Sequence, residues 1–349
     1  MNLKEKKEEH NFSKYIRGGI LSIIISLVVI SLLTGGLGFN EVKTALFNYS
    51  WLFAFAAFGV LSLKWVFEVV TLQIATGVFK RISFIRGFKI IMAVQLLNLI
   101  TPFYTGGQPA GIYLLTREGL TAGHSTAVLM IKSMMFQLFL TFFGIFSLSY
   151  LYSSMNTLTL FAAFAGLLIN GSLVLLILLF GIKQNLAKKI LNSLICFLQK
   201  IRVLKNRKRA VEFMEHQIII FNREFKRFKH QPMRLTGLFV FAGLQFSAFI
   251  FTALVILKGY GIEFSLETFT RVFLVNTSSL IVPTPGTSGG AETLYFIFLK
   301  GTGNAEMLGA SMIIWRLCTY YFAIGFTALY SILAYNKHEL VTLAEQERK

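Results

Sequence analysis

The chain has 349 residues, of which 55% are hydrophobic, 15% aromatic and only 14% charged. Its mean hydropathy of +0.65 implies more apolar surface than the core of a soluble protein can bury. The composition therefore excludes a soluble enzyme and indicates an all-α integral membrane protein, and the net charge of +18 predicts basic loops at a membrane surface.

Six apolar stretches approach the ~20 residues that a helix needs to cross a bilayer. They lie at about residues 18–37, 51–75, 122–151, 158–182, 235–260 and 305–335. Two shorter apolar stretches, 88–104 and 266–284, end in glycine and proline, and each is followed by a second short apolar piece. The sequence thus predicts six full transmembrane helices and two pairs of half-helices.

The distribution of lysine and arginine predicts the orientation, because basic loops stay on the cytoplasmic side. Residues 1–17, 80–89 and 183–234 are basic and belong inside, whereas the links 152–157 and 259–267 are uncharged or acidic and belong outside. We therefore expect a multi-pass protein of the plasma membrane with both chain ends in the cytoplasm.

This orientation leaves one path for the short stretches. Residues 88–121 must enter from the cytoplasm and return there, and residues 266–300 must enter from outside and return. The predicted fold contains two re-entrant half-helix hairpins of opposite orientation, arranged in an inverted repeat as in many transporters. The expected organisation, in chain order, is a tail (1–17), a first membrane part (18–182), a basic amphipathic cytoplasmic linker (183–234), a second membrane part (235–335) and a tail (336–349).

Both hairpins carry the spacing Pro-x-x-x-Gly-Gly at their breaks. The first runs from Pro102 to Gly106 and Gly107, and the second from Pro285 to Gly289 and Gly290. Glycine lets a backbone approach a ligand closely, and proline ends a helix. Interrupted helices at matching positions in two halves mark the binding site of inverted-repeat transporters.

Each hairpin is followed by a span that carries one cation. Lys132 comes 25 residues after Gly107, and Arg316 comes 26 after Gly290. Both lie about ten residues into their spans, which at ~1.5 Å per residue places them near the bilayer centre. An unpaired cation there costs at least ~2.5 to 3.5 kcal/mol, so we expect both to face the hairpin tips and a lipid phosphate.

The predicted substrate site combines these two cations with the residues of the tips. Its members are Lys132, Arg316, Thr105, Gly106, Gly107, Gln108, Ser288, Gly289, Gly290 and Glu292, and the structural breaks are Pro102, Pro109, Pro283 and Pro285. Half-helix N-termini at such tips present unpaired N–H groups and a positive dipole end to an anion.

Structural alternatives remain open for the charged residues. Arg316 can pair with Glu292 or Glu306 instead of a substrate, and hairpin carbonyls can satisfy Lys132. Lys64 and Glu68 are four residues apart on one helix face and can neutralise each other. Glu292 can cap its half-helix or meet an amine on the substrate.

The runs Leu97-Asn98-Leu-Ile-Thr-Pro102 to Gly106-Gly107-Gln-Pro109 and Val282-Pro283-Thr-Pro285-Gly286 to Gly289-Gly290-Ala-Glu292 carry a resemblance. They resemble the flippase-like membrane domain of the lysylphosphatidylglycerol synthase family, whose best-known member is the multiple peptide resistance factor. The resemblance covers about residues 15–335. It implies a bacterial transporter that moves an anionic or aminoacylated phospholipid between leaflets, with a link to antibiotic resistance through weakened cationic peptides.

Full-length relatives add a soluble domain that transfers lysine to phosphatidylglycerol. Only about fourteen residues follow residue 335 here, so we expect lipid handling without lysyltransferase activity. The alternative is an intramembrane enzyme, or an accessory subunit of lipid-linked synthesis, that uses Glu292, Glu118 or Glu68 as acid or base.

The remaining sequence predicts no further chemistry. The five histidines lack metal-ligand spacing, the two cysteines form no disulfide framework, and no nucleotide motif is present, so we expect no catalytic residue, metal or cofactor. The expected partners are membrane phospholipids, anionic head groups at residues 183–234, a separate lipid-modifying synthase and further copies of the chain, and not nucleic acid.

Overall fold

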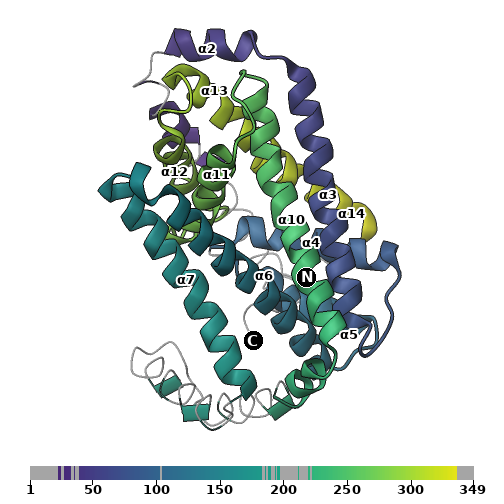
Figure 1. Ribbon diagram of the computed structural model, residues 1–349. Coiled ribbons are helices and arrows are strands. Elements are labelled where there is room, and N and C mark those ends of the chain that lie inside the picture. Colours follow the sequence, from purple (N-terminus) through teal and green to yellow (C-terminus); the bar gives the residue numbers. More distant parts are fainter. Residues whose placement is uncertain are drawn as a thin grey trace.

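The computed structural model describes residues 39–102, 104–182 and 222–335, together with a few positions between residues 23 and 35 and between residues 185 and 220. The regular structure in these residues is helical, which confirms the all-α prediction (Figure 1). Both predicted tails, most of the predicted first span at 18–37 and most of the basic linker lie outside the described residues.

The helices follow one another in the order the hydropathy pattern predicts. The longer ones are α3 (Trp51–Thr76), α6 (Ala122–Leu151), α7 (Thr157–Ile182) and α10 (Pro232–Lys258). The shorter ones are α2 (Phe39–Phe47), α4 (Phe84–Ile100), α5 (Gly107–Arg117), α11 (Leu266–Ser278), α12 (Gly290–Leu299), α13 (Ala305–Arg316) and α14 (Ala323–Ala334). A π-helical segment, η3 (Leu317–Phe322), joins α13 to α14, and 3₁₀ turns η1 (Tyr152–Ser154) and η2 (Ser279–Ile281) follow α6 and α11.

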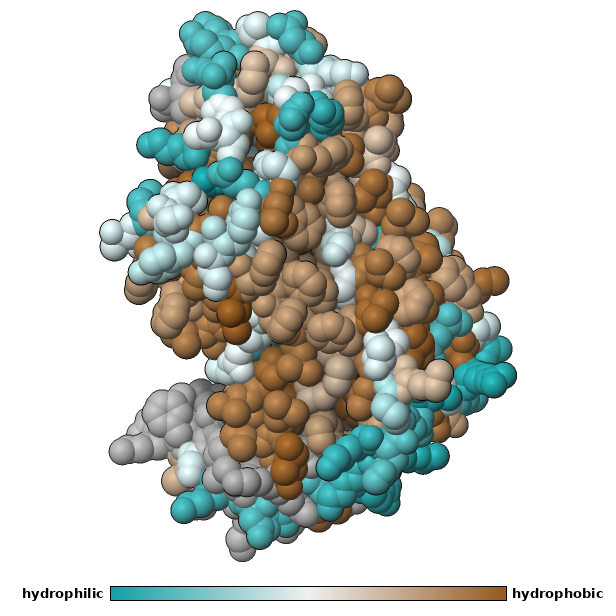
Figure 2. Space-filling model, in the orientation of Figure 1, coloured by the Kyte–Doolittle hydropathy of each residue, from teal (hydrophilic) through white to brown (hydrophobic). Residues whose placement is uncertain are grey.

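Five helices of the described chain are long and apolar enough to cross a membrane. They are Trp51–Thr76, Ala122–Ser154, Thr157–Leu179, Pro232–Lys258 and Ala305–Ala334. These coincide with the last five predicted spans. Figure 2 shows hydrophobic side chains in a broad band across the middle of the molecule, with hydrophilic side chains at its two ends. A band of this kind on a helical protein is what a bilayer requires.

Polar side chains fix where several helices begin. Thr121 precedes α6 and accepts a hydrogen bond from the backbone N–H of His124 at 3.2 Å, and Ser265 does the same for Thr268 at 3.0 Å at the start of α11. Pro232 occupies the first turn of α10, where its missing N–H costs nothing. These caps satisfy donors that a helix leaves unpaired at its N-terminus.

The helices α3 and α10 lie side by side and run in opposite directions (Figure 1). Near one end Arg234 donates to the carbonyl of Ile74 at 3.1 Å, and at the other the Tyr49 hydroxyl donates to the carbonyl of Ile256 at 3.3 Å. The helix α2 lies across the second of these ends (Figure 1). We call the first end, which holds Arg234, the basic end, and the second, which holds Tyr49, the α2 end.

The α4–α5 pair has its outer ends at the basic end of the α3–α10 pair, and the α11–α12 pair has its outer ends at the α2 end. The start of α4 meets the end of α5 at the basic end, where Arg86 Nη1 lies 3.2 Å from Glu118 Oε2. The start of α11 meets the end of α12 at the α2 end, where Arg271 Nη1 donates to the carbonyl of Phe298 at 2.7 Å. Between these ends the two pairs touch, because Pro102 and Pro285 form an isolated antiparallel β-bridge.

Candidate functional site

Polar side chains from α4 and from the break itself hold the first break, whose described residues are 101, 102 and 104–106. Asn98 Oδ1 accepts from the N–H of Gly107, and Thr101 Oγ1 accepts from the N–H of Gly106, each at 2.9 Å. A side chain at Gly107 would collide with the Asn98 amide. The glycine is therefore needed for the close approach of α4 to α5, and Asn98 satisfies a backbone N–H at the break.

The second break, residues 282–289 between η2 and α12, is built on left-handed backbone. Gly286, Thr287 and Gly289 have φ angles of +59°, +52° and +88°. The N–H of Gly289 donates to Glu292 Oε2 at 2.8 Å, which is the predicted capping role of Glu292. A side chain at Gly286 would collide with the ring of Tyr320, so this glycine lets the break pack against η3.

Arg316, at the end of α13, binds the second break. Its Nη2 lies 2.8 Å from Glu292 Oε2, and its Nη1 and Nη2 donate to the carbonyls of Gly286 and Thr287, each at 3.3 Å. The side chains of Arg316 and Glu292 are only 4% and 0% exposed. The structure thus has the Arg316–Glu292 pair that the sequence analysis gave as the alternative to substrate contact. Direct contact of Arg316 with a substrate stays a prediction.

Lys132, on α6, contacts Glu68 of α3 rather than either break. Its Nζ lies 2.9 Å from Glu68 Oε1, while Glu68 Oε2 lies 3.4 Å from Lys64 Nζ and accepts from Gln95 Nε2 of α4 at 2.6 Å. The predicted Lys64–Glu68 pair thus exists, but Glu68 is shared between two lysines. We call Lys64, Glu68, Gln95 and Lys132 the lysine cluster.

Gln108, which follows the first break, contacts α6, the helix that carries Lys132. Its Nε2 donates to the hydroxyl of Ser133, the residue after Lys132, at 2.9 Å. Gln108 is the second residue of α5 and was predicted as a site residue, whereas Ser133 and Gln95 were not. The one sequence signal for Gln95 was a polar side chain midway along an apolar half-helix.

The two breaks differ in exposure. Pro102, Thr105 and Gln108 of the first hairpin are exposed, whereas Gly286 to Ser288 of the second are buried. The remaining predicted residues do not all follow this division. Gly106 and Gly107 are buried beside Thr101 and Asn98, whereas Pro283 of the second break is exposed. Pro109 lies in the first turn of α5, Gly289 caps α12 and Gly290 begins it.

Comparison with known proteins places this geometry in a family. The model of the lysylphosphatidylglycerol synthase TM region matches residues 19–326. The chain belongs to that family. The match includes both breaks, Arg316 and the lysine cluster. A UPF0104 membrane protein of Archaeoglobus fulgidus is 24% identical over 323 residues, which cover 89% of this chain and 94% of that relative.

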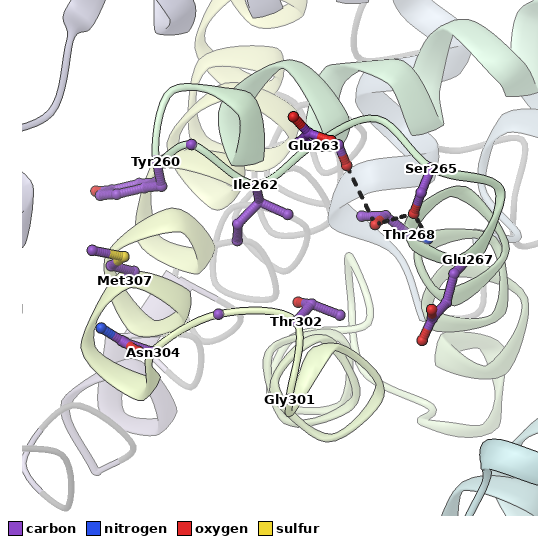
Figure 3. A pocket seen from close by; sticks show the side chains of 12 residues that line it. Tyr260, Ile262, Glu263, Ser265, Glu267, Thr268, Gly301, Thr302, Asn304 and Met307 are labelled. Atoms are coloured by element: carbon purple, nitrogen blue, oxygen red, sulfur yellow. Dashed lines mark hydrogen bonds between the residues drawn. The ribbon is translucent and has the colours of Figure 1, made fainter.

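This member of the lysylphosphatidylglycerol synthase TM family also has a pocket of about 410 Å³ at the α2 end. Figure 3 shows Tyr260, Asn304 and Met307 on one side of it and Ser265, Thr268 and Glu267 on the other. Burial raises the pKa of the Tyr260 phenol, which stays protonated and donates to the carbonyl of Ala45 at 3.3 Å. The charged side chains of the lining are Glu263 and Glu267, so the pocket has the wrong sign for a phosphate.

The carboxylates that an intramembrane enzyme would use are held in ion pairs in this family member. Glu68 binds the lysine cluster, Glu118 binds Arg86, and Glu292 binds Arg316. Among the described residues, no three histidine, cysteine or acidic side chains gather where they could hold a metal ion. The geometry therefore gives acid–base chemistry no specific support.

Proposed function

We propose that the chain is a lipid transporter that moves an anionic or aminoacylated phospholipid between the leaflets of the plasma membrane. Membership of the lysylphosphatidylglycerol synthase TM family supports a role beside such lipids. In this proposal residues 18–37 form a sixth span, both chain ends are cytoplasmic, and the basic segment 183–234 binds anionic head groups on that side.

In the same proposal α4–α5 and α11–α12 are re-entrant hairpins of an inverted repeat. Their lengths support this, because helices of 17, 11, 13 and 10 residues at ~1.5 Å per residue are shorter than the ~30 Å hydrocarbon core. A chain that goes part of the way and turns back must bury its break in protein or line a wet cavity.

The observation that carries the proposal is the contact between the two breaks. Pro102 and Pro285 form a β-bridge, and the side chains of Tyr104 and Thr287 interact beside it. One hairpin enters from each end, so this contact lies between the two openings. A head group that passes from one side to the other requires the breaks to separate.

A reversible cross-link tests this requirement. The variant Pro102→Cys with Pro285→Cys, in a Cys196→Ser background, places two thiols at the β-bridge. Opposed residues of an antiparallel pair have Cα atoms about 4.5–5.5 Å apart, within the roughly 4.4–6.8 Å that a disulfide spans. We expect oxidation to stop translocation of fluorescent phosphatidylglycerol, its lysyl ester or a polyprenyl phosphate in proteoliposomes, and reduction to restore it.

The two variants that carry only one of these substitutions are the matched controls, and the same oxidant should leave their transport unchanged. Mass spectrometry of the lipids separates the two classes of function, since a transporter leaves the mass of its lipid unchanged. Transport by the fully cross-linked protein at the rate of the reduced protein, or a chemically altered lipid, contradicts the proposal.

A further inference from the structure

Two buried charge centres among the described residues, the Arg316–Glu292 pair and the lysine cluster, differ in their charge balance. Arg316 and Glu292 form a one-to-one pair, and carbonyls of the second break take further Arg316 donors. The lysine cluster instead has two lysines around one carboxylate, and with both lysines protonated it carries a net charge of +1. An excess cation inside an apolar band favours the arrival of an anion.

The two centres also differ in access. The side chains of Lys64 and Lys132 are 15% and 13% exposed, while Glu68 and Arg316 are 5% and 4% exposed. The exposed Gln108 donates to Ser133, which follows Lys132 on α6, so an amide and a hydroxyl that can bind oxyanions lie one residue along the helix from Lys132. The two lysines are thus more accessible to an incoming anion than the enclosed arginine.

We propose that Glu68 is a resident counter-anion, which holds the place between Lys64 and Lys132 that the phosphodiester of a lipid takes during transport. This inference rests on the proposed function and assigns its phosphate site to Lys64 and Lys132. A carboxylate and a phosphodiester both present two oxygens to ammonium groups, so one can replace the other.

The contacts of Glu68 allow this exchange without leaving it unpaired. Gln95 donates to Glu68 Oε2 at 2.6 Å and remains as a partner when the lysines turn away. Lysine ammonium groups lie on flexible four-carbon chains, so they can follow the phosphate while the helices stay in place. Glu68 also returns to the lysines when the phosphate leaves, which keeps the buried charge compensated in the empty protein.

A tethered carboxylate competes with every external anion at a high local concentration. Glu68 therefore weakens binding of the lipid and speeds its release. Replacing Glu68 with glutamine keeps the shape and the hydrogen bond to Gln95 but removes the competitor. We expect Glu68→Gln to bind the anionic lipid at least about tenfold more tightly, a change of about 1.4 kcal/mol, and to slow translocation at saturating lipid.

The binding experiment uses purified full-length protein in neutral detergent, with dioctanoyl phosphatidylglycerol titrated by calorimetry. Dioctanoylglycerol, which lacks the phosphate, is the ligand control. Glu118→Gln is the matched protein control, since it removes a carboxylate paired with Arg86 outside the lysine cluster. Lys132→Met should abolish binding, and Glu118→Gln should bind as the wild type does.

Glu68→Gln leaves two buried ammonium groups without a carboxylate, so a second comparison avoids a folding defect. In a Lys64→Met background one lysine faces Glu68, and adding Glu68→Gln removes the carboxylate but leaves a single cation. The double variant should bind phosphatidylglycerol at least about tenfold more tightly than Lys64→Met alone.

The outcomes separate this inference from the proposed function. Unchanged or weaker binding in both Glu68→Gln comparisons means that Glu68 only positions Lys132, and overturns the counter-anion role. Equal tightening toward inorganic phosphate assigns the site to free oxyanions and overturns the lipid assignment. The transport proposal fails separately, through the cross-link between Pro102 and Pro285, and its failure leaves the binding result intact.

Discussion

At the scale of residues, the sequence located the buried charges but not all of their partners. Arg316 and Glu292 are 24 residues apart on consecutive elements, so their contact could be anticipated. Lys132 and Glu68 are 64 residues apart on helices that meet only in the folded protein. Helical periodicity relates Glu68 to Lys64 but carries no information about α6, so the shared carboxylate was missed.

The pair of Arg316 and Glu292 should dominate the local stability of the second break. Arg316→Ala leaves a buried carboxylate without its cation, and we expect a loss of about 3–5 kcal/mol in the free energy of unfolding. Thermal denaturation of the detergent-solubilised protein measures it. Arg316→Met combined with Glu292→Gln keeps an acceptor for the N–H of Gly289 and should recover most of the loss.

A surface pair provides the control for this prediction. Arg86 is 63% exposed and pairs with Glu118, so Arg86→Ala should change stability by less than about 1 kcal/mol. Equal melting shifts for Arg316→Ala and Arg86→Ala, or no recovery in the double variant, would show that the buried pair is not what holds the second break to α13.

At the scale of elements, length and hydropathy were sufficient for the long helices. The predicted spans 51–75 and 122–151 correspond to Trp51–Thr76 and Ala122–Leu151 almost residue for residue. The stretch 88–104 begins earlier, at Phe84, because Ser83 caps the helix. The π-helical segment after Arg316 and the short helix α2 were not predicted, since neither changes the apolar pattern of its surroundings.

The contact between α7 and the end of α11 depends on one glycine. A Cβ at Gly166 would lie 2.7 Å from the Cα of Ser278 and 2.8 Å from the carbonyl oxygen of Thr277, and backbone cannot move aside as a side chain can. We expect Gly166→Ala to cost about 1–3 kcal/mol through overpacking. Urea-dependent unfolding or thermal denaturation in detergent measures the change.

Gly59 on α3 is the matched control. A Cβ there has no neighbour within 4 Å among the described residues, so Gly59→Ala should alter stability by no more than about 1 kcal/mol and in the stabilising direction. A melting temperature for Gly166→Ala at or above that of Gly59→Ala would mean that the approach of α7 to α11 is looser than the structure describes.

At the scale of the whole molecule, each end has its own charge chemistry. At the basic end Arg234 donates to the carbonyl of Ile74 in the last turn of α3, and Arg227 donates to that of Val78 just after it. His124 Nε2 lies 3.7 Å from Glu224 Oε1 at the same end. At the α2 end the pocket is lined by Glu263 and Glu267. The sequence could assign these ends to opposite sides of a membrane, because the positive-inside rule needs only the order of charges along the chain.

This difference between the ends makes the orientation testable with cysteines introduced one at a time into a Cys196→Ser background, in which the remaining Cys318 is buried. The first set of substitutions lies before α4 and after α5, at Lys80→Cys and Glu118→Cys. The second set lies before α11 and after α12, at Glu263→Cys and Thr302→Cys. We expect a membrane-impermeant maleimide added to intact cells to label the second set, and the first set only after permeabilisation.

The two cysteines of each set must be labelled under the same condition, because a segment that turns back within the bilayer has both ends on one side. A full span has its ends on opposite sides. Opposite labelling of Lys80→Cys and Glu118→Cys would replace the first hairpin by a membrane crossing, and labelling of all four from outside would remove the inverted repeat on which alternating access between the two ends depends.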